Sequence, residues 1–322
     1  MKYIGLLLVM FLLSGCDTEK KEISLFEICN ESGSLCEKLA VDSRCKALRR
    51  DVIINSYYAR KEQDEAKKGG KEYNVLVSLE EFVNCSEKAT FIEYNYNKFK
   101  KEDQLNNRTK PLTEEEIQAR KNFKDSLKER ENTRRKNYIF ANYMLRGMNQ
   151  RTKESNDPFL LYWHWSRNGS EEAIKKLEEK VEKNEIKSYR MKFYLSQYYI
   201  KFDEEKSYEL MMSSLENLPK EEYTNKETSK KIHETKMEGM SIHFSILRQF
   251  TDYYYQKGDY VKSYIFAKLL KMKNDNTANV LDIIKYFENE NRSSISYIEN
   301  KVEEINEALE EGKFKRSMLK SV

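Results

Sequence analysis

Few residues in this chain have the types and spacing that catalysis requires. The sequence holds three histidines, His164, His233 and His243. His233-Glu234 begins like the zinc-protease motif H-E-x-x-H, but the second histidine is missing. Neither a G-x-S-x-G elbow nor a phosphate-binding glycine-rich loop occurs. Adjacent acids such as Glu171-Glu172 lie in the first turn of a predicted helix, where their negative charges interact favourably with the helix dipole. We therefore expect no catalysis, no metal and no cofactor.

A second candidate for chemistry lies at the N-terminus, where an apolar segment ends in a cysteine. Lys2 precedes an apolar run over residues 4–13, and Ser14-Gly15-Cys16 follows it. As a helix, this run would be about 15 Å long, roughly half of the hydrocarbon core of a bilayer. That length is typical of the apolar region of a signal peptide and is short for a membrane span.

Residues 13–16, Leu-Ser-Gly-Cys, resemble the lipobox of bacterial lipoproteins. The resemblance implies a signal peptide over residues 1–15, acylation of Cys16 and anchoring in membrane lipid, with a polar tether over residues 16–25. Two or three acyl chains anchor firmly because each buried CH₂ contributes about 0.8 kcal/mol. Asp17 favours the inner membrane, facing the periplasm, and the outer membrane is the alternative. An ordinary secretory signal with a chance cysteine is the other interpretation.

The remaining cysteines predict disulfides. They all lie in the first quarter of the chain, at Cys29, Cys36, Cys45 and Cys85. An even number of cysteines in an oxidising periplasm indicates two bridges, and a zinc site is less favoured because no C-x-x-C pair or nearby histidine is present. Of the three pairings that four cysteines allow, we predict Cys29–Cys36 and Cys45–Cys85.

This pairing follows from a predicted helical hairpin. Residues 49–67 and 73–94 are helix-like, and Gly69-Gly70 between them suggests a turn. Antiparallel helices would bring Cys45, before the first helix, close to Cys85, late in the second.

Composition and charge also favour helices and argue against one class of partner. Charged residues make up 35% of the 322 residues, and only 3 are proline, which would break helices. The net charge of +4 is too balanced for a nucleic-acid binder. Residues 98–136 are locally basic, which indicates a solvated helix face or, alternatively, contact with acidic phospholipid.

The second half of the chain has a repeated helical pattern. Asp157-Pro158 is typical of a helix start, with an N-cap followed by proline. Leu161 and Leu195 begin similar units 34 residues apart, and a third unit starts near Phe250. Residues 157–275 thus resemble tetratricopeptide (TPR) or Sel1-like repeats, which stack helix pairs into a continuous core.

These patterns predict an all-α protein. We expect a disulfide-stapled helical hairpin domain over residues 26–155, followed by a TPR-like helical solenoid over residues 156–322. An apolar stripe from Ile298 to Leu309 predicts a terminal capping helix that ends at Gly312. An irregular helical bundle is the alternative to the solenoid.

A TPR-like stack would present a concave groove suited to a protein or peptide partner. The residues that alignment to the repeat places in this groove are Phe159, Trp163, Arg167, Gln197, Lys201, Arg248, Asp252 and Gln256. Because neighbouring side chains on a helix point in different directions, we expect Trp165 in the core and Trp163 toward the groove. His164 between them is expected to be a packing residue.

The whole pattern resembles an uncharacterised family of Gram-negative lipoproteins. The resemblance rests on the lipobox, the Cys29/Cys36 spacing, the segment CKALRRDVI from Cys45, the later Cys85 and the repeats opened by Asp157-Pro158. It implies an envelope location and a TPR-like tail, with no activity to carry over. We therefore expect a protein-binding adaptor or scaffold. The alternatives are a peptidoglycan hydrolase or glycan-binding accessory protein of the cell wall, and a structural spacer.

Overall fold

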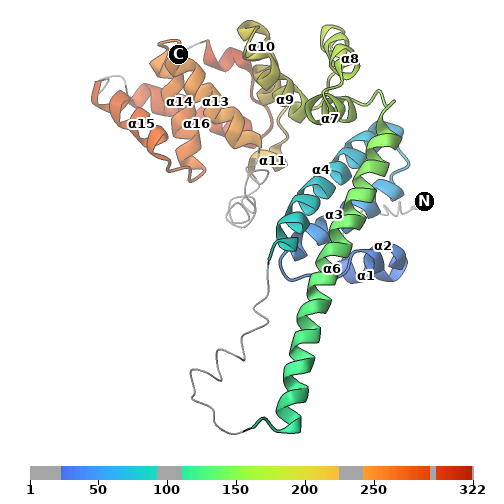
Figure 1. Ribbon diagram of the computed structural model, residues 1–322. Helices are drawn as coiled ribbons and strands as arrows, with labels where there is room; N and C mark the ends of the chain where they lie inside the picture. The colour runs from blue at the N-terminus through green and yellow to red at the C-terminus, as the bar shows by residue number, and fades with distance from the viewer. Residues whose placement is uncertain (1–22, 93–110, 225–241, 291–294, 321–322) are drawn as a thin grey trace, which may run out of the picture. The chain divides into compact units, whose positions relative to one another are not determined.

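The computed structural model describes residues 23–92, 111–224, 242–290 and 295–320 (Figure 1). All regular structure in these residues is helical, which confirms the predicted all-α class. The predicted signal peptide, Cys16 and most of the predicted tether lie outside the described residues. The chain divides into two compact units, at Met1–Ile174 and Lys175–Val322.

The first unit is built on three long helices. Its helices are α1 (Leu25–Glu31), α2 (Gly33–Lys38), α3 (Lys46–Lys61), α4 (Glu65–Thr90), α6 (Glu114–Thr152) and α7 (Pro158–Asn168). In this unit α4 lies between α3 and α6 and packs against both (Figure 1). Fully buried Ile53, Leu79 and Ala141 come from these three helices and belong to one apolar core.

Both predicted disulfides are present. The Cα atoms of Cys29 and Cys36 are 5.6 Å apart, and those of Cys45 and Cys85 are 6.0 Å apart. Cys45 immediately precedes α3, and Cys85 lies in the last third of α4. The antiparallel arrangement of these two helices therefore brings the second pair together, as expected.

The predicted turn at Gly69-Gly70 is wrong. Both glycines lie inside α4, which starts four residues earlier, where the Asp64 side chain accepts a hydrogen bond from the Ala66 amide at 3.0 Å. The cap and the good helix formers that follow it outweigh the low helix propensity of glycine. Gly69 is buried because α4 passes close to Asp157 at this point.

Alanine substitutions at these two adjacent glycines are expected to have opposite effects. A Cβ atom at Gly69 would lie 2.0 Å from Asp157 Cγ, whereas one at Gly70 would meet the Phe159 ring at 3.7 Å, an ordinary contact. Gly69→Ala should lower the free energy of unfolding by about 1–3 kcal/mol, because overpacking and disturbance of the α7 cap exceed the gain in helix propensity. Gly70→Ala should raise it by about 0.5–1 kcal/mol.

Urea unfolding measures this difference. Its signal is the fluorescence of the two tryptophans, Trp163 and Trp165, which both belong to the first unit. Equal effects of the two substitutions would contradict the close approach of α4 to Asp157.

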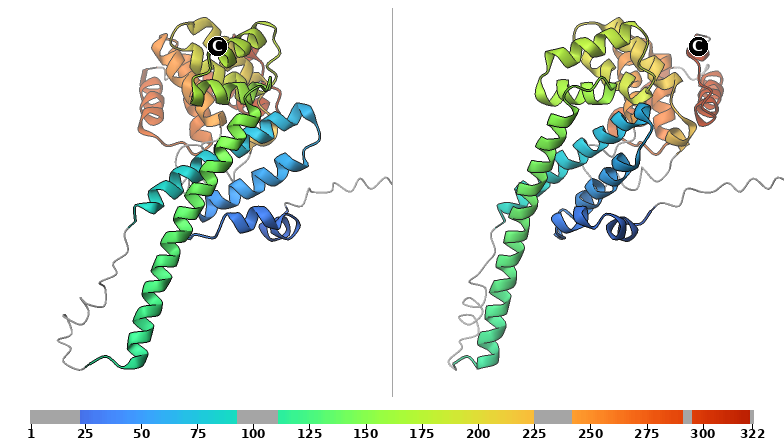
Figure 2. Two further views of the ribbon diagram at one scale, coloured as in Figure 1. Left: turned by 45° about the vertical axis from the view of Figure 1, so that its right-hand side comes forward. Right: turned by 90° about the vertical axis from the view of Figure 1, so that its right-hand side faces the viewer.

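Helix α6 is long and uninterrupted. It begins with a capping box, in which Thr113 Oγ1 accepts from the Glu116 amide at 3.3 Å and the Glu116 carboxylate accepts from the Thr113 amide at 2.9 Å. Its N-terminal part extends past the end of α4, as two further views show (Figure 2). Further along, Arg134 forms a buried ion pair with Asp42 at 2.7 Å, which fixes α6 to the segment before α3.

Helix α7 starts as predicted but belongs to the first unit. Asp157 accepts hydrogen bonds from the Phe159 and Leu160 amides, and Pro158 is the first helical residue. Because α7 packs against α4, the boundary between compact units falls after Ile174, rather than at the predicted position after residue 155.

The second unit consists of helix pairs. Its elements are the end of α8 (Glu171–Glu182), α9 (Tyr189–Tyr199), α10 (Glu204–Glu216), α11 (Lys220–Thr224), α13 (Ile242–Gln256), α14 (Tyr260–Met272), α15 (Ala278–Glu290), α16 (Ile295–Glu310) and a 3₁₀ turn (Arg316–Leu319). The pairs α9/α10 and α13/α14 use equivalent contacts. Ser207 donates to the Ser196 carbonyl at 2.8 Å, and Ser263 donates to the Thr251 carbonyl at 2.9 Å. Small buried residues thus let each pair pack closely, giving a repeat-like all-α unit.

The end of the chain follows the predicted pattern. Ile298, Val302, Ile305 and Leu309 of α16 are buried. Gly312 has a φ of 68°, in the left-handed region that favours glycine, and the Lys313 amide bonds back to Ala308 at 2.7 Å.

Candidate functional site

A large cavity of the first unit is an open groove between α3 and α6, with α4 beneath it. Its volume is about 1370 Å³. We call it the α3–α6 groove. It is lined by Ser56, Ala59, Arg60, Glu62, Glu65, Lys68, Gly69, Glu72, Val75, Tyr143, Met144, Arg146, Gly147, Met148, Arg151, Thr152, Glu154, Ser155, Asp157 and Leu160.

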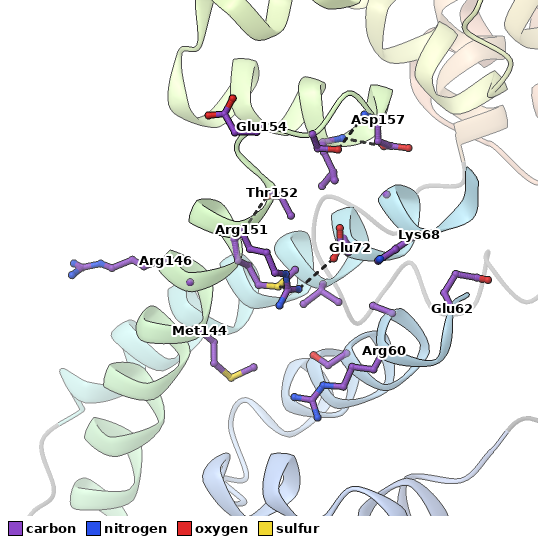
Figure 3. A pocket seen from close by; sticks show the side chains of 18 of the residues that line it. Arg60, Glu62, Lys68, Glu72, Met144, Arg146, Arg151, Thr152, Glu154 and Asp157 are labelled. Atoms are coloured by element: carbon purple, nitrogen blue, oxygen red, sulfur yellow. Dashed lines mark hydrogen bonds and ion pairs between the residues drawn. The ribbon is translucent and has the colours of Figure 1, made fainter. Parts of the chain in front are cut away.

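Charged side chains of both signs surround an apolar floor in this groove. Arg151 of α6 and Glu72 of α4 point toward each other and form an ion pair at 3.4 Å (Figure 3). Arg60 of α3 and Met144 of α6 extend toward the same space (Figure 3). Buried Met148 belongs to the core beneath. An apolar centre with a charged rim is the usual anatomy of a protein-binding surface.

Two further features of this groove are an unpaired hydroxyl in one wall and open space at the other. Ser56 is 5% exposed, and its buried hydroxyl has no hydrogen-bond partner among the described residues. A buried polar atom without a partner is unusual. On the opposite wall, a Cβ atom added at Gly147 would have nothing within 4 Å. Gly147 therefore leaves open space for a partner, whereas the Ser56 hydroxyl lies beneath the surface of the groove.

His164, beneath the groove, has a structural role. Asn168 Nδ2 lies 2.9 Å from His164 Nδ1 and can only donate to it, so the ring proton is on Nε2, which donates to Thr152 Oγ1 at 3.0 Å. Thr152 in turn donates to the Met148 carbonyl at 2.9 Å. Burial lowers the pKa of His164, which keeps the ring neutral. The network joins α6 to α7, in agreement with the expected packing role.

The three predicted groove residues of α7 pack within the first unit instead. Trp163 is 2% exposed, and its Nε1 donates to Asn149 Oδ1 at 2.6 Å. Phe159 lies against the Tyr73 ring, with centroids 5.5 Å apart. Arg167 pairs with Glu80 at 3.0 Å, and although burial opposes it, this carboxylate raises the pKa of Arg167. Trp165 is only half-buried, so the expected orientations of the two tryptophans are reversed.

The physical reason is that α7 buries its face on α4. The repeat pattern assigned the inward face of α7 by analogy with a neighbouring repeat, but the surface that α7 covers belongs to the hairpin that precedes it.

The predicted groove residues of the second unit have a different environment. Gln197, Lys201, Asp252 and Gln256 are exposed, whereas half-buried Arg248 pairs with Asp275 at 2.7 Å. Arg248 and Asp252 line a hollow of about 350 Å³ beside the start of α15. Partial desolvation of its carboxylate in this hollow raises the pKa of Asp252, and Arg248 opposes this. These residues share one face of α13, as the repeat pattern predicts.

Sequence reasoning missed the α3–α6 groove. Its lining comes from two segments far apart in the sequence, represented by Ser56 and Gly147, so no local motif marks it. An isolated glycine in a helical pattern was the one available signal, because such a glycine often has a packing or functional reason.

A metal-binding cluster and a membrane-spanning helix are both absent from the described residues. No group of three or more His, Cys, Asp or Glu side chains there could hold a metal ion. None of the helices in the described part of the chain combines the length and apolar character needed to cross a bilayer.

Comparison with known proteins identifies a family. A family described as "Protein of unknown function (DUF2989)" matches residues 13–127 and 116–268, which is most of the chain. The chain belongs to this family. Neither the curated proteins nor the solved structures gave a match.

Proposed function

We propose that this protein is a lipid-anchored lipoprotein of the cell envelope that faces the periplasm and acts as an adaptor, holding a protein partner in the α3–α6 groove. Acylated Cys16 would anchor it, and Asp17 favours the inner membrane. The two disulfides support an oxidising compartment, because such bridges are rare in the cytoplasm.

The groove itself is the observation that carries the proposal. Its volume of about 1370 Å³ exceeds the roughly 300–1,000 Å³ of small-molecule pockets, so a peptide segment or helix is a better match. Two cross-links hold the helices that line it, because Cys45–Cys85 joins the start of α3 to α4 and the His164 network joins α6 to α7. A preformed surface loses little entropy when a partner binds.

A cell-wall hydrolase or glycan-binding accessory protein is the alternative function. The groove contains carboxylates, as such an enzyme would need. However, Glu72 is engaged by Arg151, and Asp157 caps α7, so both have structural roles that favour the adaptor. A zymogram on purified peptidoglycan separates the two functions, and a clearing zone would overturn the adaptor proposal.

Filling the groove should abolish partner binding without unfolding the protein. Gly147→Trp is expected to reduce the recovered partner about 10-fold or more, because an indole has room at this position and would occupy the partner's space. Gly147→Ala is the matched control and should retain the partner. The full-length chain, tagged at its C-terminus, is crosslinked briefly and purified from membranes in mild detergent, and the co-purified proteins are quantified. Equal recovery with both variants would reject the groove as the binding site.

A further inference from the structure

The second unit contains a small hollow with an unusual lysine. The hollow has a volume of about 240 Å³ and lies among the end of α8, α9 and α10. Lys192 of α9 lines it and is only 8% exposed. Its Nζ donates to Ser213 Oγ at 2.8 Å, and it forms no ion pair with any described residue. Lysines are almost never buried this deeply without a paired acid.

The surroundings of Lys192 are positively charged. Lys206 lines the same hollow, with its Nζ 4.3 Å from the centroid of the Tyr199 ring. Lys187 lies at the edge, where its Nζ donates to the Asn184 carbonyl at 2.8 Å. Burial is the main cause that lowers the pKa of Lys192. The charge of Lys187 lowers this pKa further, and Glu216 opposes both effects.

The acid that lines this hollow does not balance these charges. Both carboxylate oxygens of Glu209 are held by Arg316, at 2.8 and 2.6 Å. This bidentate pair is already neutral, so it leaves the field of the lysines in place. The hollow thus combines two lining ammonium groups and one hydroxyl with space for a small ligand.

We propose that this hollow binds the phosphate group of a ligand, either a free phosphate compound or a phospholipid headgroup. A phosphate oxygen beside Lys192 Nζ and Ser213 Oγ would give the buried ammonium the anionic partner that it lacks. Lysine is a common phosphate binder because its ammonium acts as a compact point charge. This site is distinct from the α3–α6 groove and does not depend on the adaptor function.

Thermal denaturation with inorganic phosphate tests the site. The full-length chain in detergent is titrated with phosphate at an ionic strength held constant with sodium chloride, and unfolding is followed by circular dichroism. Phosphate should raise the Tm of the wild type, because a ligand that binds only the folded state stabilises it. Lys192→Met should weaken the apparent affinity about 10-fold or more.

Three variants make the result decisive. Lys192→Met removes an unpaired buried charge at similar volume, so it should fold with a Tm at least equal to that of the wild type. Lys206→Gln, at a less buried position, should also weaken the response. Lys271→Gln removes the same charge from an exposed position on α14 and should leave the response intact.

Vesicle flotation distinguishes the two sources of phosphate. A Cys16→Ser form, which cannot be acylated, is mixed with vesicles of anionic phospholipid. Flotation that Lys192→Met abolishes would support a headgroup, and a response to inorganic phosphate without flotation would support a free phosphate compound. A wild type that responds to neither probe, or a Lys192→Met variant that responds fully, would overturn the proposal.

Discussion

Removal of the Cys45–Cys85 disulfide is expected to lower the free energy of unfolding of the first unit by about 4 kcal/mol. The bridge spans 40 residues, so its loss restores a large conformational entropy to the unfolded chain. The variant is Cys45→Ala with Cys85→Ala, because alanine leaves no polar group at the buried Cys45 position. Tryptophan fluorescence in urea isolates this unit, since both tryptophans belong to it.

The other disulfide supplies the matched control. Cys29–Cys36 spans only 7 residues, so Cys29→Ala with Cys36→Ala should lower the free energy by about 2.5 kcal/mol. A small-loop variant that loses as much stability as the large-loop variant would contradict the entropic account. Because the larger bridge joins the two helices on one side of the α3–α6 groove, its loss should also weaken partner recovery.

The second unit is expected to lose about 3 kcal/mol of stability between pH 6.5 and pH 4 through His243. Burial lowers the pKa of His243 from 6.5 to about 4, Lys273 lowers it further, and Glu222 opposes them. Above pH 6.5 the ring is neutral in both the folded and the unfolded state, so His243 does not make the free energy of unfolding depend on pH. As the pH falls below 6.5, the unfolded state gains a proton that the folded state cannot accept, and stability declines until about pH 4.

His243→Phe should flatten this decline. Phenylalanine does not titrate and can keep the stacking on Phe244, whose ring centroid lies 4.5 Å away. Urea unfolding followed by circular dichroism measures the free energy of unfolding of the second unit. Its transition is the one that leaves tryptophan fluorescence unchanged, because both tryptophans belong to the first unit. Above pH 6.5, the free energies of unfolding of the wild type and of His243→Phe should change with pH in parallel. Below pH 6.5, that of the wild type should fall more steeply. The same acid-induced loss in both would show that His243 is not responsible.

Local signals explain the parts of the fold that could be predicted from the sequence. Thr113 with Glu116 and Asp157 with Pro158 satisfy backbone donors at helix starts, and these contacts need only neighbouring residues. The cysteine pairing was predictable because an antiparallel hairpin brings Cys45, before its first helix, close to Cys85, late in its second.

Contacts between distant segments explain the errors. The Gly69-Gly70 pair reads locally as a turn, yet Gly69 is the place where α4 passes beside Asp157, 88 residues later. Trp163 is buried by Tyr73 and Asn149 of the first unit, which the repeat pattern cannot represent. Tertiary packing thus overrides a local preference that is correct for an isolated segment.

The candidate site was the least predictable part for the same reason. Ser56 and Met144 look unremarkable in the sequence, and their significance comes from meeting Gly147 around one space. Likewise, Lys192 is one of 58 basic residues until the fold shows that it is buried beside Ser213 and forms no ion pair with any described residue.

Site-specific photocrosslinking would test the central claim most directly. A photoreactive residue is placed in the full-length, membrane-anchored chain at Arg60 or Met144, on opposite walls of the α3–α6 groove, and at Asn84, an exposed position of α4 outside it. The adaptor account predicts the same protein adduct from both groove positions and none from Asn84. No adduct from the groove, or equal labelling from Asn84, would contradict it.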